Sequence, residues 1–226
     1  MTKTIDLNRK NISEDKIRNM LRKKGLGNLL LDDKTLLESR RSFVPDNKKA
    51  NKDVWLFGYG SLIWNPVIEI EESRIAKVFG YHRKFCLKTQ IGRGSEEKPG
   101  LVLGLENGGS TSGLALKVNS LDTASELDLV WRREMITGAY KPVKVFGHTK
   151  KGNIEMIVFV INKSHTNYIG KISEAETAYT ISSARGFLGS GKDYLDKTVE
   201  SLVKLGINDS YLSRLQNRIM RQNFKT

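Results

Sequence analysis

The middle of the chain, residues 54 to about 164, is a succession of short apolar runs separated by turn residues, and no other feature constrains the fold as much. The run at 54–57 ends at a glycine, and the stretch 75–87 mixes β-branched with aromatic residues, as strands do. A single helical pattern interrupts these strand signals, at 120–137. Strands joined by hairpins with one helix between them favour an antiparallel sheet or barrel, which places the chain in the α+β class.

Two hairpins are predicted inside this region. Asn-Gly-Gly-Ser at 107–110 stands between apolar runs at 101–105 and 112–118, so a reversal of the chain is expected there. Lys-Gly-Asn at 151–153 separates two more apolar runs and predicts the second hairpin.

The N-terminal part of the chain has helical spacing. Ser13 is a candidate N-cap for a short helix with apolar residues at Ile17, Met20 and Leu21, and Gly25 is a fitting stop signal. A second helix is predicted at 34–42.

Polar residues at 45–53 then predict a linker, so residues 1–53 are interpreted as a helical extension and 54–226 as the main domain. From about residue 172 the main domain is predicted to be helical. Ser173 and Glu176 form a candidate capping box, and Gly206 is expected to separate the last two helices.

The net charge of +13 in 226 residues is concentrated at the two ends of the chain. Residues 1–53 carry +6 and residues 197–226 carry +4, which leaves +3 for the long stretch between them. The middle shows no basic stripe interleaved with aromatic residues, as a nucleic-acid groove requires. The charge therefore favours solvated terminal helices over a nucleic-acid partner.

Other sequence features exclude whole classes of protein. The one cysteine, Cys86, rules out an intrachain disulfide framework, and the scattered His82, His148 and His165 match no metal spacing, so no metal is expected. No apolar run has the length of a transmembrane helix, and the N-terminus has no apolar signal core. A cytoplasmic protein without a membrane partner is expected.

Glu134 is the clearest candidate for chemistry. On a helical wheel Leu127, Val130 and Trp131 share one apolar face, and Glu134 falls inside that stripe. Arg133 is expected to point elsewhere, as is Arg132. Burial would raise the pKa of Glu134 and suit it to general acid–base catalysis. The alternative is a structural ion pair with a neighbouring basic residue.

A second candidate is the glycine-bearing segment at 57–62, where a predicted strand ends. Gly58 and Gly60 bracket Tyr59 and allow close approach of a ligand to the backbone, although a plain turn would look the same. No third glycine completes a dinucleotide fingerprint, because Ile63 takes its place. The loop at 92–100 is either a flap over a site or an ordinary surface loop.

Three separated segments together resemble the ChaC family of glutathione-specific γ-glutamylcyclotransferases. They are residues 54–66, the glycines around Arg93 with Pro99 and Gly100, and residues 131–140, whose order and spacing agree with that family. The similarity extends into the helical tail and is greatest to the longer bacterial members, which also have an N-terminal helical extension.

The resemblance implies a small, mostly antiparallel β-barrel surrounded by helices, without a cofactor. It implies that glutathione is cleaved to 5-oxoproline and Cys-Gly, with Glu134 as the general base. The substrate would be held by Leu56, Phe57, Gly58, Tyr59, Gly60, Ser61 and Leu62.

Two alternatives stay open at this point. The enzyme could act on other γ-glutamyl amines or dipeptides, or the fold could be a non-catalytic binding module whose basic ends contact nucleic acid or an acidic partner. The sequence leaves the oligomeric state open.

Overall fold

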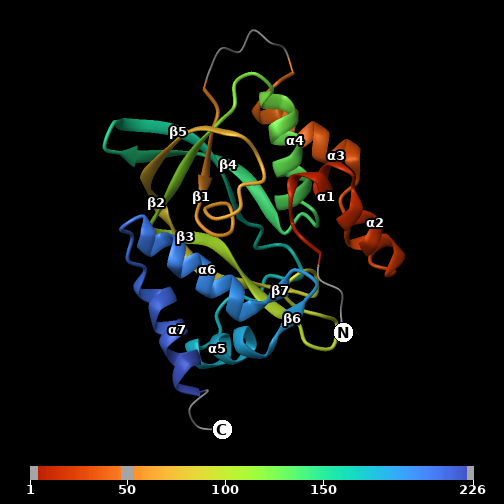
Figure 1. Cartoon of the computed structure of the whole chain (residues 1–226), viewed down its shortest axis with the longest axis vertical. Coiled ribbons are helices and arrows are strands. Elements are labelled where there is room, and N and C mark those ends of the chain that lie inside the picture. Colours follow the sequence, from red (N-terminus) through yellow and green to blue (C-terminus); the bar gives the residue numbers. More distant parts are fainter. Residues whose placement is uncertain (1–4, 47–52, 223–226) are drawn as a thin grey trace.

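The computed structural model describes residues 5–46 and 53–222, and its centre is a closed five-stranded barrel with helices on two sides (Figure 1). Neighbouring strands follow the order β1-β3-β2-β4-β5 around the barrel. The predicted α+β class with a mostly antiparallel barrel is confirmed. The strands are β1 (Trp55–Gly58), β2 (Ile70–Thr89), β3 (Gly100–Val118), β4 (Tyr140–Thr149) and β5 (Gly152–Ile161).

The strands pair antiparallel except at one seam. Leu56 in β1 pairs with Ile157 in β5 in parallel, and this contact closes the barrel. β4 and β5 form a hairpin whose last pair is Thr149 with Gly152, so the hairpin predicted at 151–153 is confirmed. Gly152, directly after the turn residues Lys150 and Lys151, has a positive φ of 109°, a conformation that residues other than glycine rarely adopt.

The hairpin predicted at 107–110 is wrong. These residues lie in the middle of β3, which continues in one direction and pairs with β2 on both sides of them. Gly108 and Gly109, with φ of 100° and 71°, face a register shift between Phe79 and Tyr81 on β2. The glycines therefore bend a long strand at an irregularity in the pairing, which uses the same backbone freedom as a turn.

The first predicted helix begins at a different residue. Ser13 ends α1 (Arg9–Ser13), which is capped by the side chain of Asn8, and α2 (Lys16–Lys23) follows. The prediction that Ser13 is the N-cap is wrong, because the chain makes a left-handed break at Asp15, with φ of 53°, before α2 starts. Gly25, with φ of 78°, ends the helical segment as predicted.

The remaining helices agree with the sequence patterns. The helix predicted at 34–42 lies within α3, where the Asp32 carboxylate accepts a hydrogen bond from the Thr35 amide. Residues 47–52 of the predicted linker lie outside the described residues. Ser173 caps α5 and Gly206 separates α6 from α7, as expected. The helices are η1 (Gly27–Leu29), α3 (Asp33–Phe43), α4 (Thr123–Glu134), α5 (Glu174–Ser183), α6 (Gly191–Lys204) and α7 (Ser210–Gln222); β6 (Arg185–Gly186) and β7 (Gly189–Ser190) are short strands.

The apolar interior forms two main clusters. One contains Phe57, Phe85 and Leu103 from the barrel together with residues of α5, α6 and α7. The other joins the outside of the barrel to α4 and to the N-terminal helices, and it contains the buried side chains of Leu21 and Trp131. Figure 1 shows α1–α4 gathered on one flank and α5–α7 on the other. Within the part of the chain described, no helix has the length and apolar character to cross a membrane.

The close pairing of β1 with β3 next to Gly113 allows a test of barrel packing. A Cβ at Gly113 would meet the carbonyl oxygen of Gly58 and lie 2.8 Å from the ring of Phe57. Gly113→Ala is expected to lower the free energy of unfolding by about 1–3 kcal/mol, since backbone and a buried ring must move apart. Gly27→Ala, whose Cβ would have the flexible side chain of Arg22 as its nearest neighbour at 3.3 Å, should stay within about 0.5 kcal/mol. Urea unfolding of both variants measures the difference, and equal stability would contradict the packing argument.

Candidate active site

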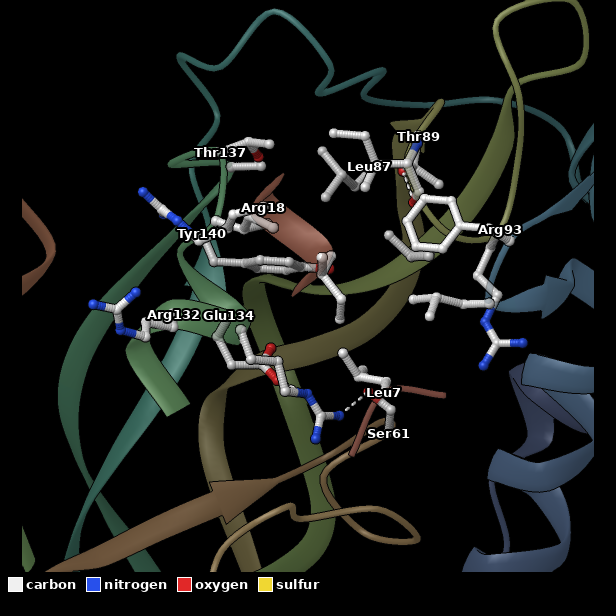
Figure 2. A pocket seen from close by; sticks show the side chains of 18 of the residues that line it. Leu7, Arg18, Ser61, Leu87, Thr89, Arg93, Arg132, Glu134, Thr137 and Tyr140 are labelled. Atoms are coloured by element: carbon white, nitrogen blue, oxygen red, sulfur yellow. Dashed lines mark hydrogen bonds and ion pairs between the residues drawn. The ribbon is translucent and has the colours of Figure 1, made fainter. Parts of the chain in front are cut away.

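Glu134 is the last residue of α4, and its side chain faces a cavity of about 840 Å³ (Figure 2). The side chain is 16% exposed, so the prediction that helix geometry turns it inward is confirmed. The cavity is also lined by Ser61, Tyr140 and Tyr194, which come from the segment after β1, from β4 and from α6. Three parts of the chain that are distant in sequence, the segment after β1, residues 134–140 and α6, therefore meet at one cavity.

Arg133 does not point away from the interior, as the helical wheel predicted. Its side chain is only 4% exposed, and Nε lies 2.9 Å from Oε1 of Glu134. The guanidinium also donates to Ser61 Oγ at 2.8 Å and to the carbonyl oxygen of Asn65. The wheel assumes one buried face, whereas the segment after β1 packs on α4 from a second side. The ion pair proposed as the alternative role of Glu134 is thus present, within a cavity.

The electrostatics of this pair follow from its burial. Burial raises the pKa of Glu134, and the positive charge of Arg133 opposes that rise. Burial lowers the pKa of Arg133, but a guanidinium starts so high that it stays protonated. A carboxylate with a raised pKa beside a fixed cation can accept a proton and return it near neutral pH.

Two tyrosines, Tyr140 and Tyr194, line the same cavity as the Glu134 carboxylate. Burial, with a smaller contribution from the negative charge of Glu134, raises the pKa of Tyr194 to about 12. The pKa of Tyr140 is raised well above its ordinary value, chiefly by burial, and its hydroxyl donates to the Leu103 carbonyl at 2.6 Å. These phenols stay neutral at physiological pH and offer polar contacts without charge.

The seven residues predicted to hold the substrate have different positions. Ser61 lines the cavity, and its hydroxyl accepts the hydrogen bond from Arg133. Tyr59 is buried and donates to the Phe159 carbonyl at 2.7 Å. A Cβ at Gly60 would lie 2.9 Å from the hydroxyl of Tyr194, so glycine allows this close approach. Leu56, Phe57, Gly58, Gly60 and Leu62 are buried.

Sequence reasoning missed Arg93, Trp64 and Lys197, which also line the cavity. Arg93 belongs to the loop between β2 and β3, which the sequence left as either flap or surface loop. Its backbone is fixed there, since the Gly92 carbonyl accepts a hydrogen bond from the Leu188 amide at 2.9 Å. The three residues come from three separate segments, so no local spacing could have joined them.

The N-terminal extension supplies part of the cavity wall, which the sequence also did not predict. Leu7 lines the cavity, and its carbonyl accepts a hydrogen bond from Asn65 Nδ2 at 2.7 Å. Ion pairs fasten the extension to α4 next to the site, because Arg132 lies 3.2 Å from Asp15 and 3.3 Å from Asp33. Among the described residues, no group of three or more His, Cys, Asp or Glu side chains is placed to hold a metal ion.

Comparison with known proteins gives the same family along most of the chain. A family model described as ChaC-like protein matches residues 54–222. The glutathione-specific gamma-glutamylcyclotransferase of Escherichia coli (strain K12) is 38% identical over 175 residues, which are 76% of each chain. The glutathione-specific gamma-glutamylcyclotransferase 1 of Homo sapiens is 28% identical over 182 residues, covering 77% of this chain and 82% of the human protein.

Solved structures agree at the level of the fold. The crystal structure of the selenomethionine-labelled γ-glutamyl cyclotransferase specific to glutathione from yeast superposes with a TM-score of 0.69. The match covers 76% of this chain and 97% of the yeast chain at 20% sequence identity. The barrel with its flanking helices is therefore the γ-glutamyl cyclotransferase fold, and the chain belongs to the family of ChaC-like proteins.

Proposed function

We propose that this chain cleaves glutathione to 5-oxoproline and Cys-Gly and that Glu134 is the general base. The observation that carries the proposal is the buried carboxylate of Glu134 at the wall of a cavity large enough for a tripeptide. The relatives that match most of the chain are named as glutathione-specific γ-glutamylcyclotransferases, which supports the same substrate.

The first step of the reaction is removal of a proton from the α-amino group of the substrate. The α-amino group of the γ-glutamyl unit is an ammonium at neutral pH and has no free electron pair. Glu134 removes one proton, the amine attacks the γ-carbonyl carbon, and the bond from that carbon to the cysteine nitrogen breaks. Glu134 returns the proton to the leaving nitrogen. The attacking nitrogen loses a second proton as the lactam forms, and the leaving nitrogen of Cys-Gly takes up a second proton to become an ammonium, so atoms and charges balance and no water is consumed.

The cavity lowers the barrier chiefly by holding the substrate folded on itself. Attack within one molecule gains effective molarity, which contributes about 7–11 kcal/mol in well-oriented cases. Arg133 and Ser61 place a cation and a hydroxyl next to Glu134, where the α-carboxylate of the substrate would lie. Fixed polar groups of this kind also stabilise the oxyanion that develops on the γ-carbonyl.

The binding-module alternative rested on the basic ends of the chain. In the N-terminal extension many of those charges have internal partners: Arg9 pairs with Glu126, and Arg40 pairs with Asp46 and Asp128. This pairing weakens the argument from net charge, and no feature of the cavity favours a polymer over a small peptide.

Replacing the base is the direct test. Glu134→Gln keeps the size of the side chain and removes its ability to accept a proton, so kcat/KM for 5-oxoproline release from glutathione should fall by about 10²–10⁴-fold. Glu155→Gln, at an exposed position on β5, makes the same chemical change away from the cavity and should keep full activity. Folding of both variants is checked by circular dichroism. A folded Glu134→Gln enzyme with undiminished turnover would remove Glu134 from the mechanism.

The raised pKa of Glu134 predicts the pH profile. The base works only when ionised, so kcat/KM should fall as the pH drops through the raised pKa, which lies above the range of an ordinary glutamate. Arg133 favours the ionised form, and Arg133→Gln is therefore expected to move the acidic limb to higher pH. Initial rates across a pH series measure the limb in both proteins. An acidic limb in the range of an ordinary carboxyl group, or one that Arg133→Gln leaves in place, would contradict this account.

A further inference from the structure

The cavity has a second polar zone, which the mechanism above does not use. Figure 2 shows Arg93 on the side of the cavity opposite Glu134 and Tyr140. Trp64 and Lys197 line the cavity as well, from the segment after β1 and from α6. This zone is defined by Arg93, Trp64 and Lys197 and is called the distal zone.

Aromatic rings hold the two cations of the distal zone. The guanidinium carbon of Arg93 lies 5.5 Å from the ring centre of Tyr194 and 6.0 Å from that of Trp64. Lys197 Nζ lies 5.4 Å from the same Trp64 ring. Trp64 is itself fixed, because its Nε1 donates to Thr198 Oγ1 at 3.2 Å. Rings attract cations through their electron-rich faces but leave the outward N–H groups able to bind an anion.

The pairing of charges separates Arg93 from other arginines at this cavity. Arg18 pairs with Asp15 and Asp33, and Arg133 pairs with Glu134. Within residues 5–46 and 53–222, neither Arg93 nor Lys197 has a carboxylate within ion-pair distance. The side-chain hydrogen bond of Arg93 there is a long one, 3.4 Å from Nη1 to the Ser190 carbonyl.

Keeping the charged guanidinium of Arg93 partly buried in the distal zone costs free energy when no anion is bound there. Burial lowers the pKa of Arg93; nearby Tyr194 and Asp193 oppose that effect, and the positive charge of Arg133 adds to it. An anion bound between the aromatic rings and Lys197 would offset both the burial of the Arg93 charge and its repulsion from Arg133. A carboxylate suits the planar guanidinium because two parallel N–H···O bonds can form.

We propose that Arg93, assisted by Lys197, binds the C-terminal carboxylate of the peptide substrate and makes the site selective for γ-glutamyl peptides that carry one. The inference rests on the proposed function for the orientation of the substrate. The α-amino group must contact Glu134, and the α-carboxylate is attached to the same carbon, so it lies near Arg133 and Ser61. The rest of the peptide extends away, and its terminal carboxylate reaches the distal zone.

The test compares glutathione with its C-terminal amide, which lacks only the distal charge. Arg93→Gln should lower kcat/KM for glutathione by about 10- to 100-fold, as loss of a charge-assisted contact does. The same variant should change kcat/KM for the amide by less than about threefold, because the contact is absent there. Lys197→Gln should act in the same direction more weakly, since Lys197 is exposed.

Two matched variants control for general electrostatics. Lys204→Gln removes the same charge from α6 at an exposed ion pair with Glu200 and should leave both substrates within about twofold. Lys88→Gln tests a rival, because Lys88 is an exposed cation that also lines the cavity. Selective loss of glutathione turnover in Lys88→Gln, with none in Arg93→Gln, would overturn the proposal.

Calorimetric binding of both peptides to the Glu134→Gln protein separates recognition from catalysis. Weaker binding of glutathione, but not of the amide, when Arg93→Gln is added supports the distal zone even if the wild type releases no 5-oxoproline. That absence of product would refute the proposed function alone. Equal effects of Arg93→Gln on both peptides, or no binding of either peptide, would refute the role of the distal zone. If the wild-type protein still released 5-oxoproline from glutathione, the proposed function would stand without it.

Discussion

The parallel pairing of β1 with β5 is the contact on which the site depends. This seam closes the barrel and fixes the point at which β1 ends, so the segment that carries Ser61 emerges next to the end of α4. Arg133 then joins the two parts by hydrogen bonds to Ser61 and Asn65. An open sheet would leave β1 without its second neighbour, and Arg133 would lose the fixed acceptors that Ser61 and Asn65 provide.

The cost of burying the Arg133–Glu134 pair is balanced by several hydrogen bonds at once. Removing two charges from water is expensive unless the remaining donors find acceptors. Arg133 satisfies this condition with a carboxylate, a hydroxyl and a backbone carbonyl. The same desolvation raises the pKa of Glu134. Burial therefore disfavours the charged carboxylate and, in the proposed mechanism, gives the base its strength.

The N-terminal extension is part of the packing around the site. It shares an apolar cluster with α4 and the outer face of the barrel, and its acidic residues Asp15 and Asp33 pair with Arg132, two residues before Glu134. The extension lies before the region that the family model matches, which starts at residue 54. The boundary between extension and main domain at residue 53 stays a prediction, and the two share one core.

Local patterns in the sequence determined much of this protein. They predicted a strand-rich middle, the β4–β5 hairpin, the helix 34–42 and the inward face of Glu134, and they include motifs specific enough to identify the family. These features follow from periodicity and turn chemistry, which act over a few residues.

The tertiary structure decided what local patterns leave free. The glycines at 108 and 109 bend β3 instead of reversing it, because pairing with β2 on both sides fixes the direction of the strand. Arg133 is buried because a segment remote in sequence covers the second side of α4. Arg93, Trp64 and Leu7 meet at one cavity only through the closure of the barrel and the docking of the extension. Such contacts depend on the register of distant strands, which spacing along the chain does not encode.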